Sequence, residues 1–131
     1  MKAYWDASAL VEATSHTLLR ARLRRERGVT RTHSLAEAFS ALTGGNLGIR
    51  LDPEAAARVV NNLAADLDFV EVNAQEVLSA LKRARKLGVR GGRVHDLLHA
   101  IAADKSGLPE LLTLDQNDFA GLTTRATVQQ V

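Results

Sequence analysis

Strand-like and helix-like segments alternate along the whole 131-residue chain. Short apolar runs bounded by turn residues are typical of buried strands, whereas apolar residues three or four positions apart are typical of helices. Such alternation favours parallel βαβ units over a helix bundle or a β-sandwich. We therefore expect a three-layer α/β/α fold with a parallel sheet of four or five strands. The expected strands are residues 2–5, 29–33, 68–72 and 111–114, with an edge strand at 127–131.

Helix boundaries are indicated by capping residues and glycines. Asp52 followed by Pro53 is typical of an N-cap with proline at the first helical position, and Asn73 is expected to cap the next helix. Gly28, a pair of glycines at 44–45, and Gly107 are expected to end helices. The expected helices cover residues 7–12, 16–27, 34–42, 53–65, 74–88 and 94–105.

The size and composition indicate one domain covering residues 1–131. The chain has no cysteine, which excludes disulfides, thiolate catalysis and cysteine-bound zinc. No signal segment precedes the first expected strand, and no apolar run approaches the ~18 residues that would span a bilayer. We expect a cytoplasmic protein with no membrane association.

Four acidic residues occupy equivalent positions in this pattern. Asp6 and Asp115 each follow an expected strand, while Glu37 and Asp96 lie near the starts of expected helices. In a parallel sheet these positions meet at the carboxyl edge, where open α/β sheets place their sites. Carboxylates that lie close together are costly unless a cation compensates their charge, and oxygen ligands suit Mg²⁺ or Mn²⁺. The sequence therefore predicts metal-dependent hydrolysis.

Each acid also has a purely local interpretation. Ser34 and Glu37 have the spacing of a capping box, in which each side chain bonds an amide at the helix start. Asp6 could be an N-cap, Asp96 a first-turn acid favoured by the helix dipole, and Asp115 a turn residue. The occurrence of all four at equivalent ends of strand–helix units favours a shared site.

A zinc site is the rival interpretation. His95 and His99 lie four residues apart around Asp96, which mimics the H-E-x-x-H motif. The shorter aspartate would reach a zinc-bound water less well than glutamate, and only His16 and His33 remain as further histidine ligands. The remaining alternatives are that both histidines pack or lie on the surface, or that His95 contacts RNA.

Positive charge is concentrated in two stretches, residues 20–27 and 82–93. A positive surface around an acidic, metal-loading pocket suits a polyanionic substrate. Arginine-rich helix faces are also common solvated surfaces, so either stretch could be that alone.

Four segments in order carry a family resemblance: DASAL at 6–10, SLAE at 34–37, HDLLHAIAA at 95–103 and TLDQNDF at 113–119. Together they resemble the motif set of PIN-domain ribonucleases, in particular the VapC-type toxins of bacterial toxin–antitoxin pairs. The resemblance covers the whole chain. It implies an endoribonuclease that depends on Mg²⁺ or Mn²⁺ and uses the acidic residues Asp6, Glu37, Asp96 and Asp115.

Within that resemblance the acids take different roles. We expect Asp6 and Asp96 to be direct metal ligands, and Glu37 and Asp115 to orient water at the ion or hold a second one. Asp118 matches a variable acidic position of the last motif and is a possible further ligand. Ser8 and Thr113 match hydroxyl positions that support the acidic cluster.

The resemblance also implies partners: an RNA substrate, a second copy in a homodimer, and a cognate antitoxin whose carboxyl-terminal segment blocks the site. Phosphate contacts are expected from six arginines: Arg22, Arg24, Arg25, Arg83, Arg85 and Arg90. The alternatives are a catalytically silent PIN-like module that binds RNA or protein, and a zinc hydrolase using His95 and His99.

Overall fold

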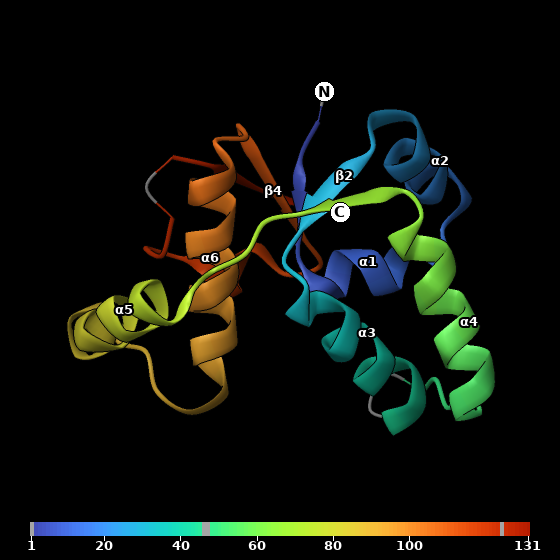
Figure 1. Ribbon diagram of the computed structural model, residues 1–131, viewed down its shortest axis with the longest axis horizontal. Coiled ribbons are helices and arrows are strands. Elements are labelled where there is room, and N and C mark those ends of the chain that lie inside the picture. Colours follow the sequence, from blue (N-terminus) through green and yellow to red (C-terminus); the bar gives the residue numbers. More distant parts are fainter. Residues whose placement is uncertain (1, 46–47, 124) are drawn as a thin grey trace.

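The structure is a computed structural model that describes residues 2–45, 48–123 and 125–131. Its centre is one parallel sheet of five strands in the order β3-β2-β1-β4-β5, which confirms the expected α/β fold (Figure 1). The strands are β1 (Tyr4–Trp5), β2 (Gly28–Thr30), β3 (Leu67–Phe69), β4 (Glu110–Thr113) and β5 (Thr127–Gln130).

Helices connect the strands and cover both faces of the sheet (Figure 1). The described residues form six α-helices: α1 (Ala7–Ala13), α2 (Thr17–Glu26), α3 (His33–Gly44), α4 (Pro53–Ala64), α5 (Ala74–Leu87) and α6 (Val94–Ser106). Two short 3₁₀ helices are also described: η1 (Gly91–Arg93) precedes α6, and η2 (Gln116–Phe119) follows β4. None of the helices in the described ranges is long and apolar enough to cross a membrane.

The two faces of the sheet have separate cores because successive strand side chains point in opposite directions. Tyr4 packs with Leu97 of α6 in one apolar cluster, which also includes Ala80 of α5. Trp5 packs in the other cluster with Leu10 of α1 and Leu23 of α2. The central strand β1 is therefore buried on both sides, as expected for the middle of a parallel sheet.

Gly28 is required by close packing between these layers. A Cβ atom at this position would lie 2.6 Å from Leu23 Cδ1 and 2.7 Å from Trp5 Cδ1. The left-handed residue at the end of α2 is Arg27, with φ of 52°. The expectation that Gly28 itself ends the helix was thus wrong by one residue, because the glycine begins β2 instead.

Other caps agree with the sequence. The Asp52 side chain accepts a hydrogen bond from the Ala55 amide at the start of α4. Asn73 and Glu76 form a capping box at the start of α5. Gly107 adopts the left-handed conformation after α6. These local signals were sufficient to predict where the three helices begin or end.

Candidate active site

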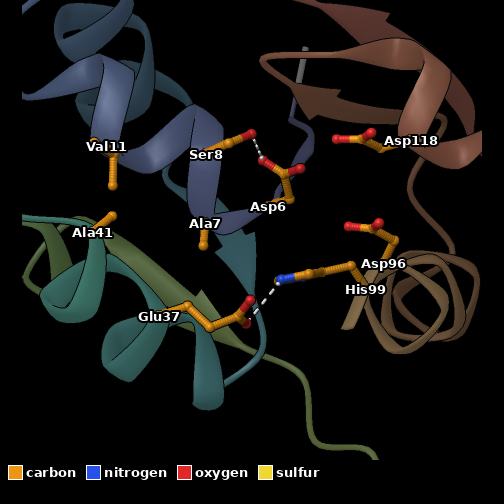
Figure 2. A pocket seen from close by; sticks show the side chains of 9 residues that line it. All are labelled: Asp6, Ala7, Ser8, Val11, Glu37, Ala41, Asp96, His99 and Asp118. Carbon is orange, nitrogen blue, oxygen red and sulfur yellow. Dashed lines mark hydrogen bonds and ion pairs between the residues drawn. The ribbon is translucent and has the colours of Figure 1, made fainter. Parts of the chain in front are cut away.

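A pocket of about 230 Å³ lies at the carboxyl edge of the sheet (Figure 2). Parallel strands all end at this edge, so residues that follow β1 and β4 meet residues near the amino ends of α3 and α6. The side chains lining it are Asp6, Ala7, Ser8, Val11, Glu37, Ala41, Asp96, His99 and Asp118. The fold thus brings together three of the four expected acids, and Asp118 with them.

Asp6 is the most deeply buried of these acids, with 5% of its surface exposed. Its Oδ1 atom accepts hydrogen bonds from the Ala9 amide at 2.8 Å and from Ser8 Oγ at 2.7 Å. Asp6 therefore is the N-cap of α1, as the local interpretation proposed, and it also lines the pocket. Burial raises the pKa of Asp6, and hydrogen bonds from Thr113, Ala9 and Ser8 only partly oppose that effect.

Asp96 lies in the first turn of α6 and faces Asp6 and Asp118 across the pocket (Figure 2). Burial raises the pKa of Asp96 to about 6, with further contributions from the negative charges of Asp118 and Asp6. The positive charge of nearby Arg93 is too small to reverse this. The ionised form of Asp96 therefore lowers the stability of the folded protein, because it is partly buried and lies near other negative charges.

None of the three aspartates forms an ion pair with a cation among the described residues. This is unlike most other acids of the chain. A buried carboxylate without a neutralising cation destabilises a protein. This cluster, in which Asp6 is buried and Asp96 half-buried, therefore indicates a site that an external cation or a bound proton must neutralise.

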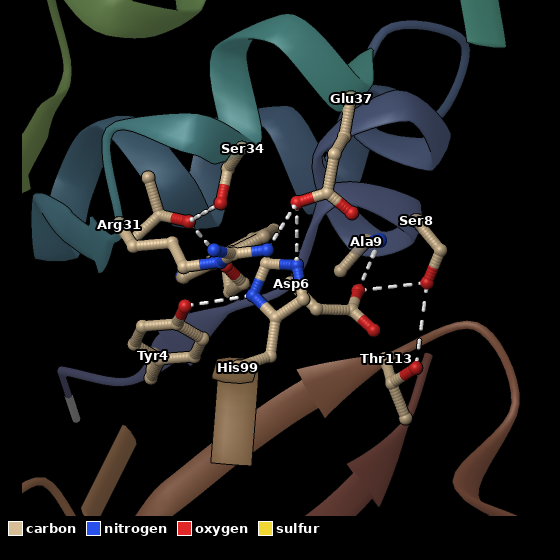
Figure 3. A network of polar contacts seen from close by, with 11 residues as sticks. Tyr4, Asp6, Ser8, Ala9, Arg31, Ser34, Glu37, His99 and Thr113 are labelled. Atoms are coloured by element: carbon tan, nitrogen blue, oxygen red, sulfur yellow. Dashed lines mark hydrogen bonds and ion pairs between the residues drawn. The ribbon is translucent and has the colours of Figure 1, made fainter. Parts of the chain in front are cut away.

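Glu37 has the opposite environment. Its Oε1 atom accepts from Arg31 Nη2 at 3.0 Å and from His99 Nε2 at 3.0 Å (Figure 3). Burial opposes its ionisation, but the hydrogen bond from His99 and the positive charge of Arg31 together lower its pKa. Glu37 is therefore ionised and already has its own counter-ion, Arg31.

The capping box proposed for Glu37 is not formed. Helix α3 begins at His33, and its N-cap residue, Thr32, makes no side-chain capping bond. Ser34 lies inside the helix, where its Oγ atom accepts from Thr30 Oγ1 at 2.6 Å. The spacing matched the motif, but the helix starts too early for Ser34 to act as the cap.

His99 is 2% exposed and both of its ring nitrogens are engaged. Nδ1 lies 2.7 Å from the Tyr4 hydroxyl, and Nε2 contacts Glu37. His95 instead stacks on His33, with ring centroids 5.8 Å apart. The two histidines therefore do not form the zinc pair that the sequence suggested.

The hydroxyls of Ser8 and Thr113 lie beside Asp6, as the resemblance implied. They are 3.3 Å from each other, and Ser8 Oγ also accepts from the Leu114 amide at 3.0 Å. These contacts join the end of β4 to the start of α1 and hold Asp6 in place (Figure 3).

Asp115 is not among the residues that line the pocket. It is exposed, and its Oδ1 atom accepts from the Asn117 amide at 3.0 Å, capping η2. Because η2 turns the chain immediately after β4, the acid three residues later, Asp118, reaches the pocket instead. Of these two acids, Asp118 therefore lines the pocket and Asp115 does not, while the catalytic role of each stays a prediction.

The first basic stretch lies away from the pocket. Helix α2 leads into the amino end of β2, so its arginines gather at the opposite edge of the sheet. Arg22 pairs with Glu26 at 2.8 Å and with Glu110 at the start of β4 at 3.1 Å. Arg24 and Arg25 are exposed and lie 3.7 Å from acidic partners. This stretch therefore does not flank the acidic groove, and the phosphate contacts expected from Arg22, Arg24 and Arg25 stay a prediction.

The second basic stretch lies at the carboxyl ends of the strands, next to the start of α6. Arg85 and Arg90 line a separate cleft with Gly88 and Val89. Arg93, three residues before Asp96, is close enough to influence its pKa. Basic residues of this stretch that form no ion pair with any described residue are Lys82, Arg83, Arg85, Lys86 and Arg90.

The carboxylates that line the pocket suit a divalent ion that binds only a few protein atoms. Within the described ranges, no group of three or more His, Cys, Asp or Glu side chains could hold a metal ion by itself. Mg²⁺ does not need such a group, because it keeps several waters and takes one or two carboxylates beside substrate phosphates. Asp6 and Asp96 supply carboxylate oxygens of the kind that Mg²⁺ and Mn²⁺ prefer.

Sequence reasoning missed Arg31 and Tyr4. Arg31 directly follows β2, so the same criterion that selected Asp6 would have found it. His99 lies one helical turn after Asp96 on α6, so helical spacing places both on one face. Tyr4 had no such signal, since its contact with His99 depends on the packing of α6 against β1.

Comparisons with known proteins agree with this fold. A family model described as "PIN domain" matches residues 3–123. Eight chains of solved structure match, among them the crystal structure of PAE2754 from Pyrobaculum aerophilum. That structure is 23% identical, covers 98% of this chain and 89% of its own, and has a TM-score of 0.70, which is a likeness of fold. No curated protein matches the chain.

Proposed function

This chain belongs to the PIN domain family, and on that premise we propose that it is a divalent-metal-dependent endoribonuclease. PIN domains are generally nucleases and typically use divalent metal ions. The observation that carries the proposal is the group of three unpaired aspartates, Asp6, Asp96 and Asp118, around one pocket.

In this proposal Asp6 and Asp96 would hold the ion, and Asp118 would add negative charge at the rim. A divalent ion bound there supplies an activated water and stabilises the charge that develops on the phosphodiester oxygens. The chain's own groups prepare the site. Ser8 and the Ala9 amide fix the orientation of Asp6, and Glu37 offers an ionised carboxylate on the opposite wall.

RNA is proposed as the substrate because of the motif resemblance and the charge around the pocket. The unpaired cations of α5 and of the loop after it, including Arg85 and Arg90, are available for backbone phosphates. Phe, Tyr and Trp make up only 4% of the chain, so stacking on aromatic side chains is a poor alternative source of affinity. Binding through phosphates is therefore the favoured mode.

The finer assignment as a VapC-type toxin rests on the four ordered motifs. If the chain is such a toxin, we further propose that it forms a homodimer and that the carboxyl-terminal segment of a cognate antitoxin covers the pocket. Growth arrest on expression of this chain, relieved by the product of a neighbouring small gene and absent in Asp6→Asn, would support this assignment. Unimpaired growth with active enzyme in the cell would exclude it.

The nuclease proposal is tested with chelator-treated protein and an end-labelled RNA, beside a DNA of the same sequence. We expect internal cleavage of the RNA when Mg²⁺ or Mn²⁺ is added, and no rescue by Zn²⁺. Asp6→Asn keeps an oxygen that can cap α1 but removes the charge, so it should remain folded and inactive. Full activity of that variant in saturating Mg²⁺ would overturn the site assignment. RNA binding without cleavage in the unaltered protein would favour the silent-module alternative.

A further inference from the structure

We propose that His99 is a positioning residue: Tyr4 holds it in the Nε2–H tautomer, and in that form it fixes Glu37 with one carboxylate oxygen open to the pocket. The effect on turnover rests on the proposed nuclease function, whereas the tautomer itself does not. The four groups involved, Tyr4, His99, Glu37 and Arg31, form one chain of polar contacts across the wall of the site (Figure 3).

The two oxygens of Glu37 are used differently. The hydrogen bonds from Arg31 Nη2 and from His99 Nε2 are both made to Oε1, at 3.0 Å. Oε2 has no hydrogen-bond partner among the described residues, although Glu37 lines the pocket. One oxygen is therefore committed to the protein, and the other remains as an acceptor for a water or hydroxyl in the pocket.

The donors and acceptors around His99 determine its tautomer. An ionised carboxylate can only accept, so His99 Nε2 must donate to Glu37. The Tyr4 hydroxyl is buried, and its proton needs an acceptor. His99 Nδ1, 2.7 Å away, supplies that acceptor only if it carries no proton. The phenol thus donates to Nδ1, and the neutral imidazole donates from Nε2.

Arg31 and His99 also explain why Glu37 differs from the aspartates opposite. Arg31 is 7% exposed and is its buried counter-ion. Glu37 therefore needs no added cation to stay ionised, whereas the three aspartates pair with no cation among the described residues. We infer that the site has two parts: an aspartate wall that receives the metal, and a Glu37 wall that is assembled before any metal binds.

A simple packing role for His99 predicts a different result. A core histidine would need only to fill its volume, so leucine would replace it and the choice of tautomer would have no consequence for turnover. The positioning role requires a donor at the Nε2 position. Glutamine can supply an N–H donor at a similar distance, and leucine cannot.

The tautomer is tested by long-range ¹H–¹⁵N correlation spectra of the ¹⁵N-labelled full chain, without RNA or metal, with His99 assigned from the spectrum of His99→Gln. We expect the Nε2–H pattern at neutral pH, and in Tyr4→Phe a clear change in the Nδ1 shift. A protonated Nδ1, or a spectrum that Tyr4→Phe leaves unchanged, would overturn the proposal whether or not the protein proves to be a nuclease.

The positioning role is tested by kinetics. We expect His99→Leu to lower kcat by about 10- to 100-fold, as is typical when a partner that orients a functional side chain is removed. KM for RNA and the affinity for Mn²⁺ should stay close to those of the unaltered protein, and His99→Gln should recover part of kcat. Ser106→Ala is the matched control, since it removes a hydroxyl hydrogen bond at the far end of the same helix.

If His99→Leu fails to fold, Tyr4→Phe replaces it, because this change removes only a hydroxyl and should still lower kcat without raising KM. An equal fall in kcat in the leucine and glutamine variants, or an effect seen only in KM, would contradict the positioning role. An unaltered protein that does not cleave RNA would instead count against the proposed function, while the spectra would still decide the tautomer.

Discussion

Single residues at the pocket differ in whether a nearby cation balances their charge, and the pH dependence of stability measures this difference. Asp96 has an ordinary carboxyl pKa of 3.8 when the chain is unfolded and a pKa of about 6 in the folded protein. The folded state therefore binds the proton more tightly. The stability that the folded protein gains from this tighter proton binding is complete below pH 4 and is lost as the pH rises through 6.

Asp96→Asn should therefore stabilise the metal-free protein at pH 8 but not at pH 4. Because the residue is only half-buried, solvent screening reduces the gain to about 1 kcal/mol in the free energy of unfolding. Urea unfolding at the two pH values measures it. Equal stability of variant and unaltered protein at pH 8 would show that the ionised carboxylate is not under repulsion.

Asp118 and Asp115 provide a second prediction at this scale. Only Asp118 lines the pocket, whereas Asp115 caps η2, and asparagine can cap as aspartate does. We expect Asp118→Asn to lower RNA cleavage by about 10-fold or more, as for other groups that support a metal site, and Asp115→Asn to leave it nearly unchanged. The reverse ranking in a single-turnover assay would restore the acid set expected from sequence.

Sequence alone identified Asp6, Glu37 and Asp96 because each lies where a strand ends or a helix begins. It selected Asp115 and gave Asp118 only as a possible further ligand, whereas Asp118 lines the pocket, because the choice depends on how η2 turns the chain after β4. It could not identify Tyr4 as part of the site either, because a buried tyrosine on a central strand is an ordinary core residue. Long-range packing decides both cases.

At the scale of elements, local signals predicted helices better than strands. The caps Asp52 and Asn73 were predicted correctly, whereas β2 and β3 are shorter than the alternating patterns suggested. The failed capping box at Ser34 and Glu37 shows why such motifs are ambiguous: the spacing says nothing about where the helix starts. The location of the basic helices followed only from topology, since α2 and α5 look alike in sequence but lie at different edges of the sheet.

This topology predicts an asymmetric path for RNA. Replacing Arg85 and Arg90 together with glutamine should weaken RNA binding and flatten its salt dependence, with the slope falling by roughly 0.7 for each single-strand phosphate that is no longer neutralised. The matched change of Arg24 and Arg25, which lie at the opposite edge, should leave the slope unaltered. Fluorescence anisotropy across a salt series measures the slope. A slope that changes only in the variant of Arg24 and Arg25 would mean that RNA binds at the opposite edge of the sheet.

At the scale of the whole molecule, the parallel sheet explains why the acids meet. Five strands of one direction bring their carboxyl ends to one edge, and helices on both faces contribute residues to the same pocket (Figure 1). The fold thus brings Asp6, Glu37 and Asp96 together from segments distant in sequence. Holding the three pocket aspartates together without a cationic partner among the described residues lowers stability, and binding of a cation should restore it.

Calorimetric titration of Mn²⁺ into the metal-free protein tests the central claim most directly. We predict one saturable site at pH 6, release of protons on binding because Asp96, with a pKa of about 6, is about half protonated there, and loss of the site in Asp96→Asn. The site should persist in Asp115→Asn, which removes an equal charge outside the pocket. Binding that is unchanged in Asp96→Asn, or no saturable binding by the unaltered protein, would contradict the claim that these aspartates form a divalent-metal site.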